Sequence, residues 1–166
     1  MNLWISNILR FVILLMLQVL LFNNLNLGGL CTPLVYILFL IALPKEVRRW
    51  QELLIGAATG LILDIFCNTL GINMAACILL SYLKPLLIKN MVQEYERLTG
   101  EIDSKSVGMD VYVKLVAILT VVHHSAVFLL ESFTTKYIWL TLLQIIISSM
   151  VTIILILGYE LLRKLK

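Results

Sequence analysis

Charged residues are scarce in this sequence: Asp, Glu, Lys and Arg make up 14% of its 166 positions, while hydrophobic residues make up 61%. Soluble domains carry about 25% charged residues. Together with a mean hydropathy of +1.00, this scarcity excludes an ordinary soluble domain. The net charge of +3 is too small to indicate nucleic-acid binding. The composition therefore predicts an integral membrane protein.

Cysteine is also scarce, and no catalytic motif is present. Cys31, Cys67 and Cys77 have no C-x-x-C or C-x-x-H spacing, which argues against a metal site. We expect buried free thiols, with a Cys31–Cys67 disulfide as the alternative. The sequence lacks a nucleophile elbow, a Ser/His/Asp arrangement and a phosphate-binding glycine loop. These absences predict a protein that is not an enzyme and that holds neither a cofactor nor a metal.

Long apolar runs dominate what is present, and about 20 such residues cross a bilayer as a helix. The sequence predicts one all-α integral membrane domain, a compact bundle of about six transmembrane helices. The expected spans are residues 3–22, 30–43, 51–68, 71–87, 111–130 and 137–158, with a polar cytoplasmic loop at 88–110. The run 30–43 is short and holds Pro33 near its start, so it is either a steep span or partly re-entrant.

Positive charges are distributed unevenly between the segments that join the spans. With the N-terminus inside, one cation, Lys136, falls on the outer side. The inner cations are Lys45, Arg48, Arg49, Lys84, Lys89, Arg97, Lys105, Arg163, Lys164 and Lys166. This bias predicts a multi-pass membrane protein with both termini cytoplasmic. Arg10 interrupts the first span, and it either snorkels to the headgroups or forms an ion pair inside the bundle.

The stretch 56–82 carries a single carboxylate, Asp64, in the middle of an expected span. A carboxylate there costs about 2.5–3.5 kcal/mol on insertion scales, so we expect it to face protein or water. Gly56 and Gly60 form a G-x-x-x-G just before it, which allows a second helix to approach closely. That second helix belongs either to this bundle or to a partner protein.

His123 and His124 are expected at a depth similar to that of Asp64. Adjacent helical residues point about 100° apart, so at most one of them can meet Asp64. Two interpretations stay open: an Asp64–histidine contact in the outer half of the bundle, or histidines bonded to nearby serines and carbonyls. The spacing does not match a helical metal-binding pair, which needs i, i+4 histidines.

The polar loop mixes cations and carboxylates, which is typical of a solvated surface. The alternative is a docking patch for a cytoplasmic partner, centred on Lys89 and Arg97.

Most of the chain up to Leu87 resembles the MreD family, the rod shape-determining membrane proteins of bacteria. The shared features are Pro33, the 41–44 IALP ending of the second span, Gly56, Gly60, Leu63-Asp64, Leu70-Gly71, Ala76 and Tyr82. Beyond Leu87 only length and hydropathy agree. No role for His123 or His124 is carried over.

The resemblance implies a non-enzymatic membrane scaffold subunit of the elongasome, the complex that synthesises peptidoglycan during cell elongation, located in the bacterial cell (inner) membrane. MreD-like proteins associate with MreC, a single-span membrane protein. Through MreC they reach the actin-like MreB, the glycosyltransferase RodA and a class B penicillin-binding transpeptidase. The residues that would form helix packing or the partner interface are Gly56, Gly60, Asp64, Gly71 and Tyr82.

The MreD fold is similar to that of the substrate-binding S-component of energy-coupling-factor vitamin transporters, which gives an alternative function. Such a subunit should show small-residue spacing on its first helix, whereas residues 10–22, RFVILLMLQVLLF, are bulky. An outer cavity lined by Asp64, Asn68 and Asn73 would then hold a lipid or small molecule.

Overall fold

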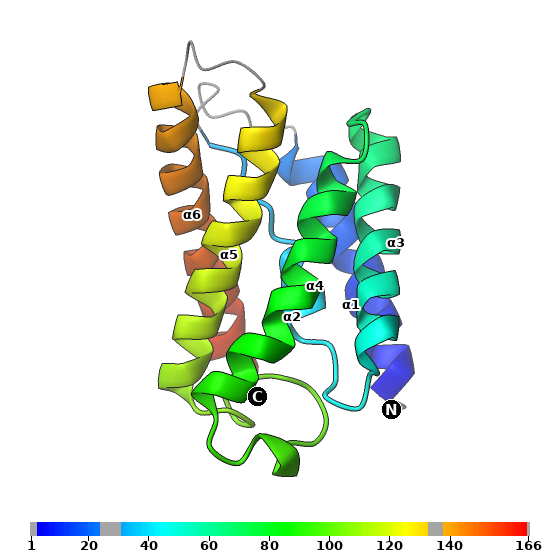
Figure 1. The fold of residues 1–166 in the computed structure, drawn as a ribbon, viewed down its shortest axis with the longest axis vertical. Helices are drawn as coiled ribbons and strands as arrows, with labels where there is room; N and C mark the ends of the chain where they lie inside the picture. Colours follow the sequence, from blue (N-terminus) through cyan, green and yellow to red (C-terminus); the bar gives the residue numbers. More distant parts are fainter. Residues whose placement is uncertain (1–2, 24–30, 133–137, 166) are drawn as a thin grey trace.

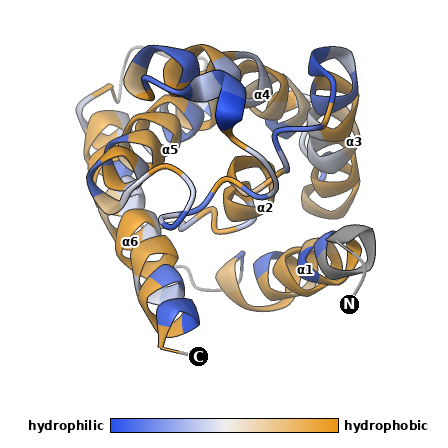
Figure 2. Cartoon of the chain, turned by 90° about the horizontal axis from the view of Figure 1, so that it is seen from below, coloured by the Kyte–Doolittle hydropathy of each residue, from blue (hydrophilic) through white to orange (hydrophobic). Residues whose placement is uncertain are grey.

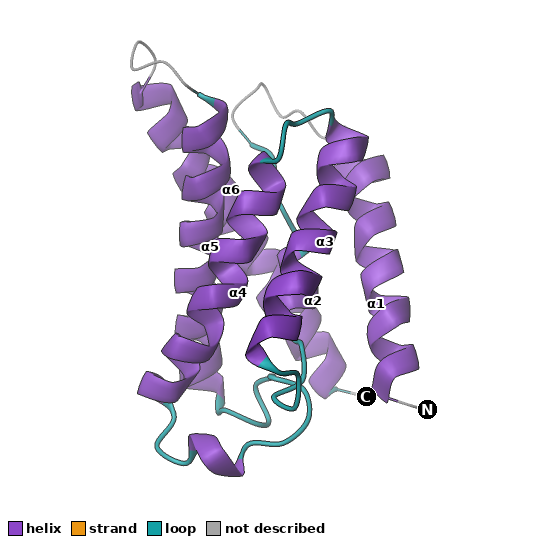
Figure 3. Cartoon of the chain, turned by 45° about the vertical axis from the view of Figure 1, so that its right-hand side comes forward, coloured by secondary structure: helices purple, strands orange, loops and turns teal. Residues whose placement is uncertain are grey.

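The computed structural model describes residues 3–23, 31–132 and 138–165, and these form six α-helices and no strand (Figures 1 and 3). The helices are α1 (Leu3–Leu17), α2 (Ile37–Ile41), α3 (Arg49–Cys67), α4 (Ile72–Met91), α5 (Met109–Glu131) and α6 (Ile138–Lys164). A π-helical turn, Gln18–Phe22, continues α1, and a 3-10 turn spans Tyr95–Arg97. Residues 24–30 at the junction of the first two expected spans, residue 137 at the start of the sixth span, Lys136 and Lys166 lie outside the described residues.

Four of these helices, α3 to α6, are long and apolar enough to cross a membrane, in agreement with a multi-pass membrane bundle. Successive helices from α3 to α6 pack against one another, and α1 stands at one side of the bundle (Figures 1 and 2). Both chain termini lie at the same end of the bundle, below in Figure 1. We call this the terminal end, and the other the distal end.

The second apolar segment differs from a regular span. Residues 31–43 pass through the centre of the bundle, where almost every side chain is buried, but only α2 within them is helical (Figure 2). Fourteen helical residues would cover about 21 Å, against a hydrocarbon core of about 30 Å. An extended chain rises about 3.3 Å per residue. Residues 31–34, which have no regular structure, and the turn at residues 35–36 precede α2 and let this short segment run through the bundle. We call residues 31–36 the extended segment, although Tyr36 already has helical backbone angles.

The glycines of α3 pack against α4 of the same chain. A Cβ added at Gly60 would lie 2.5 Å from the carbonyl oxygen of Asn73, and one at Gly56 would lie 2.9 Å from that of Cys77. Both contacts are with backbone, so the two helices approach closely only because these positions lack side chains. The helix that packs on the G-x-x-x-G face is therefore α4 of this bundle and not a helix of a partner protein.

A tight turn joins α3 to α4 at the distal end. Asn68 ends α3 with a φ of 55°, and Gly71 precedes α4 with a φ of 81°. Glycine adopts such a left-handed backbone without steric cost, which explains its use at the second of these positions. The turn brings the start of α4 beside the last turns of α3, where Asp64 lies.

At the terminal end, the helices at the two ends of the chain are tied to the loop before α5. Arg10 lies 2.8 Å from Glu101, and Arg163 lies 3.0 Å from the same carboxylate and also pairs with Asp103. Arg10 therefore pairs with a carboxylate of the loop at the terminal end and not with one inside the bundle. Burial alone would raise the pKa of Asp103, but the backbone N–H of Ser106 and the Arg163 guanidinium hold that pKa below its usual value.

Candidate functional site

The extended segment has backbone groups that cannot pair within a helix, and two side chains of α6 satisfy part of them. The amide of Thr32 donates to Ser148 Oγ at 3.0 Å, and that of Leu34 donates to Thr152 Oγ1 at 3.2 Å. Non-helical backbone at membrane depth is tolerated where protein groups replace the missing bonds. Ser148 and Thr152 are four residues apart and so lie on one face of α6, which lets them accept from the amides on either side of Pro33.

Gln18, fully buried at the start of the π-helical turn, satisfies the other part. Its Oε1 accepts from the amide of Val35 at 2.9 Å, and its Nε2 donates to the carbonyl of Pro33 at 3.1 Å and to Asn23 Oδ1 at 2.9 Å. One side chain thus replaces two backbone bonds of the extended segment. Side chains from both α6 and the end of α1 are therefore needed to hold this segment in place.

Asp64 caps α4. Its Oδ1 accepts from Thr69 Oγ1 at 2.5 Å, from the amide of Asn73 at 3.0 Å and from Asn73 Nδ2 at 3.1 Å, and its Oδ2 accepts from the amide of Met74 at 3.0 Å. Four bonds match the acceptor capacity of a carboxylate. The partial positive charge of a helix N-terminus also favours an anion there. The intramembrane carboxylate is accordingly compensated by the start of the next helix.

The two histidines bond elsewhere, so of the two interpretations left open by the sequence the direct contact with Asp64 is not the one found. Tyr36 Oη donates to Asn73 Oδ1 at 3.1 Å and lies 3.0 Å from His123 Nε2. Because the single tyrosine proton goes to Asn73, we assign the Nε2–H tautomer to His123, donating to Tyr36. Asp64 and His123 are thus joined only through Asn73 and Tyr36. In the described part of the chain, His123 Nδ1 is buried without a hydrogen-bond partner.

His124 points to α6 instead. Its Nδ1 lies 2.9 Å from the carbonyl of Thr120 and its Nε2 lies 3.2 Å from Thr152 Oγ1. The carbonyl can only accept, so Nδ1 carries the proton and Nε2 accepts from Thr152. Thr152 in turn accepts from the amide of Leu34. Both histidines therefore support the extended segment, His123 through Tyr36 and His124 through Thr152.

A cavity of about 410 Å³ with a mixed polar and apolar lining lies at the distal end beside this network. Its polar lining residues are Asn23, Thr32, Cys67, Thr69, Asn73 and Glu131. Of the three residues expected around an outer cavity, only Asn73 lines it; the carboxylate of Asp64 accepts from the amides of α4, and Asn68 is exposed on the turn.

The three cysteines, Cys31, Cys67 and Cys77, are free thiols, as expected, and Cys31 and Cys67 form no disulfide. Cys31 and Cys77 are buried, and Cys67 is partly exposed.

The remaining expected site residues lie at the terminal end. Tyr82 is half-exposed, with the Arg49 guanidinium 4.9 Å above its ring. Lys89 is exposed on the last turn of α4, and Arg97 pairs with Glu94 at 2.9 Å on the surface. Lys89 and Arg97 line one shallow surface groove, so the structure brings the two candidate docking residues together.

Sequence analysis did not single out Gln18, Tyr36, Ser148 or Thr152. The feature that could have identified these residues is a polar side chain inside an apolar run. Ser148 and Thr152 are in addition four residues apart, which puts them on the same face of a helix. Within the described residues, no group of three His, Cys, Asp or Glu side chains is placed to hold a metal ion.

Replacing Asp64 with alanine is expected to lower the free energy of unfolding by about 1–2 kcal/mol, as for loss of a helix N-cap. The amides of Asn73 and Met74 would lose their acceptor. Asp64→Asn keeps one acceptor oxygen and should fall between the wild type and alanine. Reversible unfolding in mixed micelles measures all three proteins. An alanine variant as stable as the wild type would contradict the capping role.

Comparison of the chain with known proteins identifies no relative. No family model, no curated protein and no solved structure matches the chain.

Proposed function

We propose that this chain is a non-enzymatic scaffold subunit of the bacterial cell-elongation complex and that it binds an MreC-like single-span membrane protein. The motif resemblance to the MreD family motivates the proposal. The observation that carries it is an apolar groove lined by residues of α1, α2 and α6.

The groove has a volume of about 260 Å³. Its lining residues are Leu9, Arg10, Ile13, Leu14 and Leu17 of α1, Leu38 of α2 and Tyr159 of α6. An α-helix with side chains is about 10–12 Å across, so its outer residues, and not its axis, would enter the groove. Apolar side chains at this position suit a partner helix that crosses the same membrane.

The inside of the bundle supports a structural role. Asp64, His123, His124 and Gln18 bond to backbone or to side chains that hold backbone, which keeps a broken span in one conformation. The face of α3 that carries Gly56 and Gly60 is covered by α4, so a partner helix cannot pack there. The partner helix is therefore assigned to the groove and not to the G-x-x-x-G face.

The charge distribution supports a cytoplasmic terminal end. Lys45, Arg49, Lys89, Arg97 and Arg163 all belong to segments at this end, and Lys and Arg are enriched on the cytoplasmic side of membrane proteins. In the inner membrane, both termini then face the cytoplasm. MreB, RodA and a class B penicillin-binding transpeptidase are reached through the MreC-like partner, and the groove at Lys89 and Arg97 is available to a cytoplasmic protein.

The distal cavity favours a second candidate function, that of an S-component-like subunit of a vitamin transporter. Asn23, Asn73 and Glu131 would offer polar contacts to a small molecule from the outer side. The bulky α1 weighs against this candidate, because its exposed face carries Ile8, Leu9 and Met16 in place of small residues.

A photo-crosslinking residue at Ile13 is expected to capture the coexpressed MreC-like protein of the same organism, whereas one at Leu61 on α3 should not. Both positions are 49% exposed, but only Ile13 lines the groove. The readout is the crosslinked pair on an immunoblot. Equal capture at the two positions, or at neither, would reject the groove. Recovery of an ATPase with its coupling subunit would favour the transporter function instead.

A further inference from the structure

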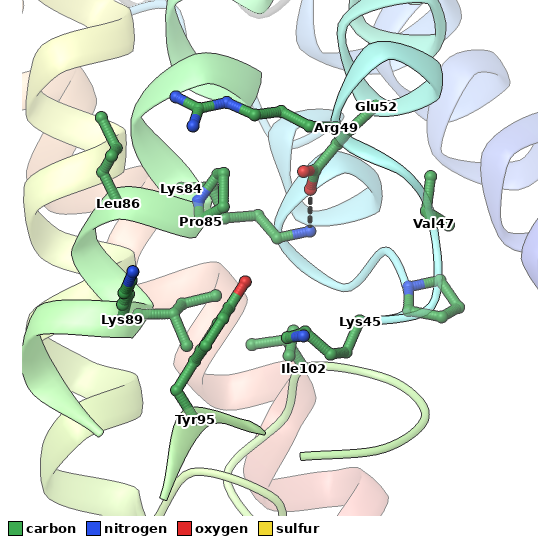
Figure 4. Close-up of a pocket in the computed structure, with 12 residues that line it drawn as sticks. Lys45, Val47, Arg49, Glu52, Lys84, Pro85, Leu86, Lys89, Tyr95 and Ile102 are labelled. Atoms are coloured by element: carbon green, nitrogen blue, oxygen red, sulfur yellow. Dashed lines mark ion pairs between the residues drawn. The ribbon is translucent and has the colours of Figure 1, made fainter. Parts of the chain in front are cut away.

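A cavity of about 270 Å³ at the terminal end is lined by cations from three parts of the chain (Figure 4). Lys45 precedes α3, Arg49 begins α3, and Lys84 and Lys89 belong to α4. The one carboxylate among the lining residues is Glu52. The lining therefore carries a clear excess of positive charge.

Lys84 does not contribute to this excess, because its ammonium is already saturated. Its Nζ lies 2.5 Å from Glu52 Oε1 and donates to the carbonyls of Leu40 and Leu43, each at 3.1 Å. An ammonium has three N–H donors, so all of them are used. The pair is buried and neutral as a whole, which leaves Lys45, Arg49 and Lys89 as the net charge of the cavity.

These three cations have no carboxylate partner within the described residues. Lys45 Nζ lies 4.2 Å from the centre of the Tyr95 ring, and the Arg49 guanidinium lies over Tyr82. Contact with a ring face fixes the direction of a cation but leaves its N–H donors free. The first turn of α3 lines the same cavity, and a helix N-terminus adds partial positive charge.

The residues around this cavity are of the kinds found at a membrane–water interface. Trp50, next to Arg49, is 56% exposed, and Tyr82 is half-exposed; exposed Trp and Tyr are enriched at the membrane–water interface. The other walls are apolar, from Pro44, Pro85 and Ile102. At about 30 Å³ per water molecule, the volume corresponds to roughly nine waters. That is room for a small charged headgroup but not for acyl chains.

We propose that this cavity binds the phosphate headgroup of an anionic membrane lipid of the phosphatidylglycerol class. Lys45, Arg49 and Lys89 contact the phosphate, and the apolar walls receive the glycerol carbons. Basic pockets between transmembrane helices are suited to anionic headgroups, and each nearby Lys or Arg contributes about 1 kcal/mol, which corresponds to roughly five-fold in affinity. A zwitterionic headgroup would bring its own cation into the same field and so bind more weakly.

The test is the melting temperature of the detergent-purified full chain, titrated with short-chain phosphatidylglycerol, short-chain phosphatidylcholine or glycerol 3-phosphate. Binding to the folded state raises this temperature with ligand concentration. We expect phosphatidylglycerol to bind tightest. Arg49→Gln/Lys89→Gln should weaken its binding by roughly 25-fold. The matched control is Lys105→Gln, an exposed cation at the same end that does not line the cavity; it should leave the titration unchanged.

Three outcomes would overturn the proposal. Equal shifts with phosphatidylcholine would show that the headgroup charge is not recognised. Equal shifts with glycerol 3-phosphate would assign the cavity to a soluble phosphate and not to a lipid. An equal loss in the Lys105→Gln variant would indicate general surface charge. Since no step depends on an MreC-like partner, these results are independent of the groove lined by α1, α2 and α6.

Discussion

Replacing Lys84 with methionine is expected to lower the free energy of unfolding by about 3–5 kcal/mol, the typical cost of removing one partner of a buried ion pair. The side chains of Lys84 and Glu52 are 3% and 6% exposed. Without the ammonium, Glu52 keeps a buried charge that nothing compensates. The carbonyl of Leu40 in α2 and the carbonyl of Leu43 just after α2 also lose their donor. The variant therefore weakens both the α3–α4 contact and the anchoring of the broken span.

Two further variants separate the ion pair from a general effect of losing a lysine. Lys89→Met removes an exposed lysine from the same helix and should change stability by less than about 0.5 kcal/mol when no anionic lipid is present. The double variant Glu52→Leu/Lys84→Met should be more stable than Lys84→Met alone, because no unpaired charge stays buried. Reversible unfolding in mixed micelles measures these differences. If Lys84→Met and Lys89→Met are equally stable, the ion pair does not stabilise the bundle.

The long helices of this fold are predictable because the bilayer imposes their length on the sequence. For α3 and α5, the helices begin two residues before the expected spans 51–68 and 111–130 and end within one residue of them. The fourth span was expected to end at 87, but α4 continues through Pro85 to Met91. Polar residues mark the membrane boundary, and they do not by themselves end a helix.

The course of residues 31–43 could not be predicted in the same way. Pro33 and the short length indicated an unusual span, and both features are local. Its non-helical first part is held by Gln18, Ser148 and Thr152, which come from distant parts of the chain. Because backbone bonds to side chains of other helices follow no sequence period, local patterns do not reveal them.

For the candidate site, too, some features could be predicted from the sequence and others could not. Because burying a carboxylate in a membrane is costly, the sequence correctly indicated that Asp64 has protein partners. Counting residues along a helix gives the depth of a residue in the membrane, but not the direction in which its side chain points. His123 is joined to Asp64 only through Asn73 and Tyr36. Likewise, the G-x-x-x-G motif indicated a close approach of helices without identifying which helix approaches.

Replacing Gly60 with alanine is expected to lower the free energy of unfolding by about 3 kcal/mol, at the upper end of the cost of overpacking. The new Cβ would meet the carbonyl oxygen of Asn73 at 2.5 Å and also the Cα of Met74. Backbone atoms of a helix cannot rotate away as a side chain can, so α3 and α4 must separate. Asn73 and Met74 also donate to Asp64, and the separation would strain that cap.

Gly158 provides the matched control, since it is also a glycine inside an apolar helix but has no atom within 4 Å of an added Cβ. Gly158→Ala should be neutral or stabilising by up to about 1 kcal/mol, because alanine favours the helical conformation. Gly56→Ala should lie between the two, since its nearest neighbour is the Ser81 side chain, although the Cys77 carbonyl at 2.9 Å adds some crowding. The measured quantity is the free energy of unfolding in the same micelles. Equal stability of Gly60→Ala and Gly158→Ala would show that close packing of α3 on α4 does not require a glycine at position 60.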